Sequence, residues 1–420
     1  MKFSATEWQR KIYLRGFSGI RPPVSIDFSK LEATAVGRLD QQAGAYIVGG
    51  AGNESSMRAN REAFEKVRII PRMLRDVGEC DTQIELFGHA IPSPFLLAPI
   101  GVLEMADAAA DLAVARAAAA LGVPFIFSNQ ASVPMEECAS AMGDSPHWFQ
   151  LYWSKSNELV ASFVRRAEQC GCSALVVTLD TTMLGWRPRD LDLAYLPFLE
   201  GKGIAQYTSD PVFQKMLDDM AEDPADPDRI LNLQSLQGLI TMVNKYPGKG
   251  FFKKLRSGRP TKAVRQFVST YSNPRTTWED LKFLRELTKL PILLKGILHP
   301  DDALKSLDAG MDGIYVSNHG GRQVDGSIAS LDALPEIVEV VKNKVPIIFD
   351  SGVRGGADAF KAIALGATAV CIGRPYAYGL AIAGQEGVHA VIGNFMADLA
   401  LTMGLAGCRR ADEITSECIA

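Results

Sequence analysis

The sequence predicts an α/β fold, a (β/α)8 TIM barrel with an N-terminal helical extension and a long insertion in its fourth βα loop. Two observations lead to this prediction. Short apolar runs rich in β-branched and aromatic residues recur along the 420-residue chain, and helix-like segments separate most of them. Eight such runs can be counted, which is the strand number of this barrel. A doubly wound sheet is the alternative, but no G-x-G-x-x-G turn follows the first run.

Residues 1–90 are expected to form the helical extension, packed on a barrel made by residues 91–420. Two helices are predicted in this first part, at 39–46 and 53–67, with a glycine-rich stretch between them that suits a helix end. Tyr46 closes the first of these helices. For a single tyrosine, packing at a helix end is the ordinary interpretation.

The predicted strands are short and mostly apolar. They are 95–98, 124–128, 148–152, 174–179, 291–295, 313–317, 346–350 and 368–372. The clearest predicted helices are 107–121, 157–169, 301–309, 331–343 and 356–365. Several of these helices are followed at once by glycine, which is the preferred residue just past a helix end. Strands and helices that alternate in this way build a parallel sheet that can close into a barrel.

One connection, at about 188–275, is far longer than an ordinary βα loop. It contains a Pro/Asp-rich piece at 222–228 and a basic piece at 253–265. Because a βα loop leaves a barrel from its catalytic face, the insertion could form a lid over the site. A mobile, solvated excursion is an equally open alternative. We do not expect the basic piece to contact an anionic membrane.

Composition excludes several classes of function. The net charge of −4 gives no reason to expect nucleic acid as a partner. The N-terminus lacks the apolar core of a signal peptide, and we find no charge-free apolar run long enough to span a bilayer. The seven cysteines are scattered, which predicts reduced thiols rather than disulfides or a zinc site. We therefore expect a cytoplasmic protein without a structural metal.

Catalytic groups in a barrel come from the C-terminal ends of the strands. The candidate site residues at or just after the predicted strand ends are, in chain order, Pro99, Ile100 and Gly101; Ser128 and Asn129; Gln150 and Tyr152; Thr178, Asp180 and Arg187; Lys295; Ser317, His319 and Arg322; Asp350, Ser351, Gly352 and Arg354; and Gly373 and Arg374. Glycines and arginines after the last two strands are what the usual phosphate site of a barrel requires.

The segment 313–326 has the clearest chemical pattern. His319 can take up a proton near neutral pH, and Arg322, three residues on, offers a planar fork for a carboxylate or phosphate. Two glycines between them let the backbone approach a ligand closely. A polar surface turn is the alternative for the segment alone. None of the other four histidines combines a strand end with an arginine three residues away.

Asp180 and Lys295 each have a structural and a functional interpretation. Asp180 could form a buried salt bridge or cap a helix, or it could orient His319 and stabilise its charged form. Lys295 could belong to a structural ion pair or face a cofactor. The barrel prediction favours function for both residues.

The segment 317–323, Ser-Asn-His-Gly-Gly-Arg-Gln, resembles the signature of FMN-dependent 2-hydroxy acid oxidases and dehydrogenases. Further blocks that look like this family, in the family's order, are 60–64, 97–99, 149–152, 178–180, 294–296, 350–354 and 372–374. The resemblance covers nearly the whole chain from about residue 40. Segments 185–190, 211–215 and 373–377 are more similar to the lactate 2-monooxygenase branch, whose long fourth loop also resembles the insertion.

The resemblance implies an FMN cofactor and assigns roles to the residues at the strand ends. The implied substrate-binding residues are Tyr46, Tyr152, Arg187, His319 and Arg322. The implied catalytic residues are His319 as the base, Asp180 as its support, Tyr152, and Lys295 beside the flavin. The implied cofactor-binding residues are Pro99, Ile100, Gly101, Ser128, Gln150, Thr178, Lys295, Ser317, Asp350, Ser351, Gly352, Arg354, Gly373 and Arg374.

The implied reaction is oxidation of a small L-2-hydroxy acid with O2. The branch resemblance implies conversion of L-lactate to acetate, CO2 and water. An oxidase that releases pyruvate and H2O2, or a dehydrogenase, is the alternative, and an FMN barrel isomerase or a non-catalytic binding protein fits the residues less well. The family also implies a homotetramer or homo-octamer. Segments 47–49 and 324–325 depart from the family pattern, which leaves the size of the substrate open.

Overall fold

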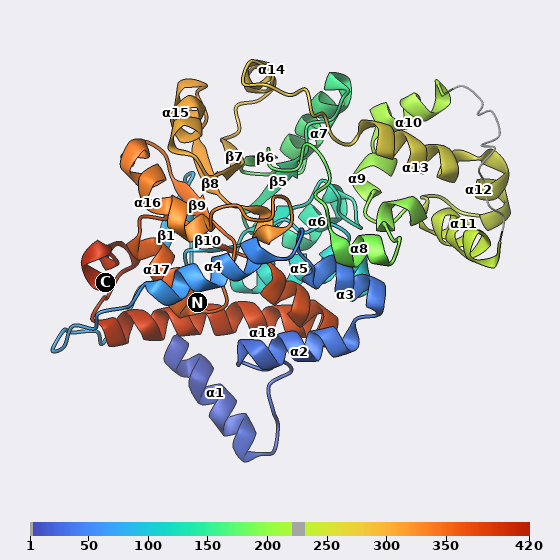
Figure 1. Cartoon of the computed structure of the whole chain (residues 1–420). Helices are drawn as coiled ribbons and strands as arrows, with labels where there is room; N and C mark the ends of the chain where they lie inside the picture. Colours follow the sequence, from blue (N-terminus) through green and yellow to red (C-terminus); the bar gives the residue numbers. More distant parts are fainter. Residues whose placement is uncertain (1–2, 221–231) are drawn as a thin grey trace.

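The computed structural model describes residues 3–220 and 232–420, and its centre is a closed barrel of eight parallel strands (Figure 1). In barrel order the strands are β3 (Phe95–Leu97), β4 (Phe125–Phe127), β5 (His147–Leu151), β6 (Leu175–Thr178), β7 (Ile292–Ile297), β8 (Gly313–Val316), β9 (Ile347–Phe349) and β10 (Ala369–Ile372). Pairing of β10 with β3 closes the ring. The predicted (β/α)8 fold is confirmed, and each predicted strand lies within two residues of the observed bounds.

Side chains alternate along each strand between the barrel interior and the surrounding helices. One buried residue from each strand forms an apolar interior layer, namely Leu96, Ile126, Trp148, Val176, Leu293, Tyr315, Ile348 and Cys371. Their neighbours along the strands belong to the larger core shared with the helices. A parallel sheet covered on both faces needs apolar side chains on both, which explains the continuous apolar runs in the sequence.

Helices surround the barrel. They are α5 (Ala110–Leu121), α6 (Met135–Met142), α7 (Asn157–Gln169), α14 (Asp280–Leu287), α15 (Pro300–Asp308), α16 (Ser330–Val341), α17 (Gly356–Ala364) and α18 (Arg374–Ala406). The five helices named from the sequence are all present. Length and composition alone would let α18 cross a membrane. In the fold it is interrupted at Ala383 and Gly384 and packs against α5, α17 and the N-terminal helices, as a core helix does.

The N-terminal part is more helical than predicted. Its helices are α1 (Ala5–Phe17), α2 (Phe28–Arg38), α3 (Gln41–Val48) and α4 (Ser55–Lys66), and they precede an antiparallel hairpin of β1 (Ile84–Leu86) and β2 (His89–Ile91). The two predicted helices are present as α3 and α4, whereas α1 and α2 were not predicted. Ser4 and Asp27 cap the two missed helices through their side chains, and this signal was present in the sequence. The proposed division near residue 90 stays a prediction.

The insertion is largely helical where it is described. Its elements are α8 (Pro188–Asp192), the 3-10 helix η2 (Pro197–Glu200), α9 (Ala205–Thr208), α10 (Pro211–Asp218), α11 (Leu233–Lys245), α12 (Phe251–Ser257) and α13 (Arg259–Thr270). The helices α10–α13 form a lobe beside the barrel (Figure 1). The Pro/Asp-rich piece at 222–228 lies outside the described residues.

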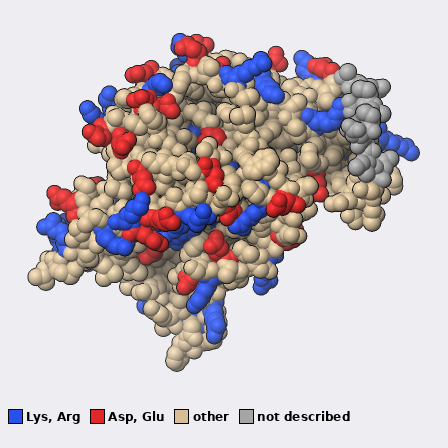
Figure 2. Space-filling model, viewed as in Figure 1, with Lys and Arg blue, Asp and Glu red and all other residues tan. Residues whose placement is uncertain are grey.

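Polar contacts fasten this lobe to the barrel. Glu104, after β3, forms an ion pair with Lys245 of α11, and its carboxylate accepts a hydrogen bond from the Gly203 amide (3.1 Å). At the other end of the lobe, Ser154 donates to the carbonyl of Thr270 (3.0 Å). The described part of the insertion is thus a helical lobe attached to the barrel. On the face seen in Figure 2, acidic and basic side chains are interspersed.

Candidate active site

The barrel interior changes from apolar to polar at its C-terminal mouth. The residues two positions beyond the apolar layer are Ala98, Ser128, Gln150, Thr178, Lys295, Ser317, Asp350 and Gly373. Because residues two apart on a strand point to the same side, these eight form the next layer toward the mouth. All of them except Ala98 were predicted from the sequence as cofactor residues.

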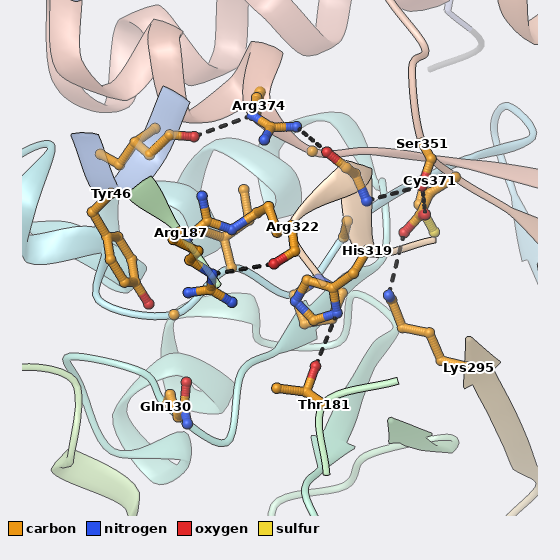
Figure 3. Close-up of a pocket in the computed structure, with 18 of the residues that line it drawn as sticks. Tyr46, Gln130, Thr181, Arg187, Lys295, His319, Arg322, Ser351, Cys371 and Arg374 are labelled. Atoms are coloured by element: carbon orange, nitrogen blue, oxygen red, sulfur yellow. Dashed lines mark hydrogen bonds and ion pairs between the residues drawn. The ribbon is translucent and has the colours of Figure 1, made fainter. Parts of the chain in front are cut away.

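A cavity opens at this mouth (Figure 3). It holds about 1070 Å³ of space, part of it open to solvent. The predicted site residues that line it are Tyr46, Pro99, Ile100, Gly101, Tyr152, Arg187, Lys295, His319, Arg322, Asp350, Ser351, Gly352, Arg354, Gly373 and Arg374. The predicted residues that do not line it are Ser128, Gln150, Thr178, Asp180 and Ser317.

His319 forms a dyad with Asp180. The Nδ1 atom of His319 lies 2.7 Å from Oδ1 of Asp180, and the hydroxyl of Thr181 donates to the same carboxylate oxygen (2.9 Å). The His319 side chain is 20% exposed and that of Asp180 is 12% exposed. Since Nδ1 is taken by the carboxylate, Nε2 is left as the ring atom that can accept a proton.

The charges around the dyad favour a neutral imidazole beside an ionised carboxylate. Burial lowers the pKa of His319, and the nearby Lys295 lowers it further, while Asp180 acts in the opposite direction. Burial alone would raise the pKa of Asp180, but His319 and Lys295 hold it well below its usual range. A neutral histidine with an anionic partner is ready to act as a general base.

Lys295 fits both interpretations made from the sequence, a structural ion pair and a cation that faces a cofactor. Its ammonium donates to Ser317 Oγ (2.9 Å) and lies 3.6 Å from Asp180 and 3.8 Å from Asp350. Burial alone would lower the pKa of Lys295, but the two carboxylates raise it, so the residue stays charged. Tyr315 in turn donates to Asp350 (2.9 Å). Lys295 is thus a buried, ion-paired cation that also faces the cavity.

Two arginines stand beside the dyad. Arg322 donates to the carbonyl of Gly49 (2.7 Å), and its guanidinium lies 5.0 Å from the centre of the Tyr46 ring. Arg187 donates to Gln323 Oε1 (2.9 Å) and to the carbonyl of Arg322 (3.2 Å). Burial, together with repulsion by Arg187 and Arg374, lowers the pKa of Arg322 to about 9. Such a cluster of buried cations is poorly compensated by the protein itself and favours anionic ligands.

Arg354 and Arg374 extend the positive region toward the ends of β9 and β10. Burial lowers the pKa of Arg354 to about 10, and repulsion by Arg374 contributes. Arg374 donates to the carbonyls of Ile47 (3.2 Å), Gly49 (2.9 Å) and Gly320 (2.9 Å), two of which are drawn in Figure 3. Arg374 therefore also holds together the loops that surround the cavity.

The cavity suits the FMN that the resemblance implies. Three buried polar atoms at the C-terminal ends of β4, β5 and β6, Nδ2 of Asn129, Nε2 of Gln150 and Oγ1 of Thr178, have no hydrogen-bond partner among the described residues. They can serve the polar edge of a flavin ring. Arg354 and Arg374 line the cavity and offer positive charge for a phosphate.

Several residues of the cavity wall were not predicted from the sequence. Thr181 follows Asp180 directly, and Cys371 shares the interior side of its strand with Gly373, so both could have been found from position alone. Phe198 and Tyr271 come from the two ends of the insertion. No local pattern marks them, because only the folding of the lobe brings them back over the barrel.

Comparisons with known proteins agree with this geometry. A family model described as FMN-dependent dehydrogenase matches residues 35–420. The chain is 43% identical to an L-lactate oxidase of Lysinibacillus sphaericus over 92% of this chain and 90% of the relative. It is 41% identical to an FMN-dependent alpha-hydroxy acid dehydrogenase of Penicillium citrinum, over 98% and 95% of the two chains.

Solved structures lead to the same conclusion. Mandelate oxidase with (S)-4-hydroxymandelic acid aligns with a TM-score of 0.76 at 34% identity, covering 93% of this chain and 97% of that one. A mutant of mandelate oxidase with a C4a-OH-FMN adduct aligns with a TM-score of 0.74 at 34% identity, over 91% and 96% of the two chains. The chain therefore belongs to the FMN-dependent dehydrogenase family and is an FMN-dependent oxidoreductase.

Proposed function

We propose that this enzyme oxidises a small L-2-hydroxy acid, with L-lactate as the substrate and acetate, CO2 and water as the products formed with O2. The observation that carries the substrate class is the meeting of one base, His319, and two arginines, Arg187 and Arg322, in one cavity. A 2-hydroxy acid presents a carboxylate beside a hydroxyl, and this arrangement offers a partner for each. When bound, FMN supplies the electron acceptor and the reactivity toward oxygen.

The arginines would bind the substrate carboxylate. Two charge-assisted contacts fix the orientation of a small acid better than one, which places its Cα–H bond reproducibly. Tyr46 and Tyr152 line the same space and would donate to the substrate oxygens. Burial raises the pKa of both tyrosines, so their hydroxyls stay protonated as donors at neutral pH.

His319 would take the hydroxyl proton of the substrate at Nε2. Asp180 holds the opposite nitrogen at 2.7 Å, so the imidazolium that forms has an anion beside it. Lys295 keeps a buried positive charge in the polar layer, where it would offset negative charge that develops during oxidation. These residue roles are the ones that the family resemblance implies.

The insertion supports the monooxygenase form of this proposal. Phe198 and Tyr271 line the cavity from the lobe, and their rings, 6.4 Å apart, lie next to Phe267 in an aromatic cluster. A roof of this kind would retain the keto acid long enough for it to be decarboxylated. The similarity to an L-lactate oxidase favours the second candidate, an oxidase that releases pyruvate and H2O2.

Product analysis tests the proposal. L-lactate is added in air to the purified flavoprotein, and acetate, CO2, pyruvate and peroxide are measured. Acetate and CO2 with little peroxide is the expected result. Pyruvate with an equal amount of peroxide would identify an oxidase instead, and turnover only with an added quinone would identify a dehydrogenase. If L-lactate did not reduce the flavin but a larger 2-hydroxy acid did, only the assignment of the substrate would be wrong.

A further inference from the structure

Arg354, at the proposed phosphate end of the cavity, has an aromatic support that comes from outside the family-matched region. The guanidinium carbon of Arg354 lies 4.5 Å from the centre of the Phe28 ring. Phe28 is the first residue of α2, whereas the family match begins at residue 35. Helix α2 lies against α18, which begins at the other arginine of this region, Arg374 (Figure 1).

The contact with Phe28 suits an arginine that has to bind an anion. Arg354 is buried, and burial together with repulsion by Arg374 lowers its pKa. A cation above an aromatic ring is attracted by the face of the ring, and this attraction uses none of the N–H donors. A carboxylate in place of the ring would neutralise the arginine and occupy its donors. Phe28 therefore stabilises the cation without using its N–H donors, one of which binds the carbonyl of Val353 (3.0 Å).

Neighbouring contacts hold the Phe28 ring in place. Asp27 caps α2 by accepting a hydrogen bond from the Lys30 amide (3.0 Å). The Phe28 ring lies 6.1 Å from the ring of Tyr378, and the Tyr378 hydroxyl donates to Glu32 of α2 (2.8 Å). The start of α2 is thus fixed against α18 by a cap, a ring contact and a hydrogen bond.

We propose that Phe28 is a positioning residue for the FMN phosphate and acts by holding the Arg354 guanidinium toward the cavity. This inference rests on binding of FMN in this cavity, but it does not depend on which 2-hydroxy acid is oxidised or on how oxygen reacts. The N-terminal helix α2 is then part of the cofactor site.

The test measures the affinity of the apoprotein for FMN and for riboflavin, which lacks the phosphate, by flavin fluorescence. Phe28→Leu removes the ring but keeps an apolar side chain, and it should weaken FMN binding about 3- to 30-fold, the range of a cation–π contact. Its affinity for riboflavin should stay within about 2-fold of the wild type. Phe28→Tyr keeps a ring and should restore FMN binding.

Two controls separate a specific effect from a general one. Phe3→Leu removes another N-terminal aromatic, which packs on Trp8 (5.8 Å between ring centres), and should leave both affinities unchanged. In an Arg354→Gln background, Phe28→Leu should have no further effect on FMN affinity. Equal weakening of FMN and riboflavin, or unchanged FMN affinity, would overturn the role of Phe28. If the wild-type apoprotein bound neither flavin, the cavity would not be the FMN site, and the proposed role of Phe28 would also be overturned.

Discussion

His319 is the residue on which the proposed chemistry depends most. Replacing it by glutamine keeps a polar side chain of similar size but removes the base. We expect reduction of the enzyme by L-lactate to slow by about 10²- to 10⁴-fold, the usual contribution of a general base. FMN should remain bound. Anaerobic stopped-flow absorbance measures the rate, and the flavin spectrum measures occupancy; reduction at the wild-type rate would exclude His319 as the base.

The pH profile of kcat/KM should show the titration of His319 in its pair with Asp180. Burial lowers the pKa of His319, so the acidic limb should have its midpoint below the ordinary histidine value of about 6.5. Activity is present when the imidazole is neutral and is lost as the pH falls through this pKa. Asp180 raises the pKa of His319, so Asp180→Asn should move the limb to lower pH and also reduce kcat.

An unchanged limb in Asp180→Asn would show that another group is titrating. The His319→Gln variant is the matched control, because it retains Asp180 and has no imidazole to titrate. If its residual activity showed the same acidic limb, the assignment to His319 would be wrong.

Position along a strand was enough to predict most of the polar layer at the barrel mouth. Ser128, Gln150 and Thr178 lie two residues beyond interior apolar positions, and the period of a strand places such residues in one layer. Phe198 and Phe28 could not be identified in this way. Both act through contacts between segments far apart in the chain, and no local period encodes such contacts.

At the scale of elements, Gln323 connects the two loops that carry the site. Its amide oxygen accepts from Arg187 (2.9 Å), and its amide nitrogen donates to the carbonyls of Asp180 (2.7 Å) and Met183 (3.0 Å). The loops also approach closely at Gly185, where a Cβ atom would lie 2.6 Å from the carbonyl oxygen of Arg322. One side chain thus fixes Arg187 relative to the dyad.

Gln323→Leu should therefore weaken carboxylate binding. We expect about a 10- to 100-fold loss in kcat/KM, as for loss of a hydrogen bond to a charged group, mainly through a higher KM. Oxalate, a carboxylate that cannot be oxidised in this way, should bind more weakly to the same degree. Gln323→Asn keeps a neutral amide with an acceptor and a donor, and it should bind oxalate more tightly than Gln323→Leu. Equal oxalate affinity in wild type and Gln323→Leu would contradict this role.

Asp325, one of the departures from the family pattern, has a structural explanation. Its carboxylate accepts from the Asn53 amide (2.7 Å), the Ser55 hydroxyl (2.6 Å) and the Ser56 amide (3.0 Å), at the start of α4. These hydrogen bonds, that of Ser55 above all, lower the pKa of Asp325 to about 2. Asp325 thus caps α4 from a distant loop and anchors the segment that follows His319.

Asp325→Ala should lower the free energy of unfolding by about 1 kcal/mol, as loss of a helix cap does. The lowered pKa means that this contribution is complete above the ordinary aspartate pKa of about 4 and is lost as the pH falls through about 2. Urea unfolding at pH 7 measures the change. Glu62→Gln, on the exposed side of α4, is the matched control and should have little effect.

At the scale of the whole molecule, the barrel was predictable and the peripheral helices were not. The eight strands are continuous apolar runs because both faces of their sheet are covered, and such runs can be recognised in the sequence. The helices of the insertion instead depend on contacts such as the Glu104–Lys245 ion pair, which join distant parts of the chain. Sequence periodicity over a few helical turns does not reveal which short polar helices form contacts with distant parts of the chain.

Helix α1 also bears on the predicted homotetramer or homo-octamer, which stays a prediction. Its outer part carries large exposed side chains, with Tyr13 70%, Leu14 55% and Phe17 95% exposed. Apolar side chains this exposed are typical of surfaces that contact another chain. We expect a mass of four or eight chains by light scattering, and Phe17→Asp should lower it. A monomeric wild type would contradict the prediction.

The buried thiol of Cys371, in the cavity wall, affects the oxidative stability of the enzyme. In the proposed reaction with oxygen, peroxide arises in the cavity that Cys371 lines, where a reactive cysteine would be oxidised. Burial, with the nearby Asp350, raises the pKa of Cys371 well above its ordinary value, and a protonated thiol is a poor nucleophile toward peroxide. Cys371 thus stays a protonated thiol, the form that resists oxidation by peroxide over many turnovers.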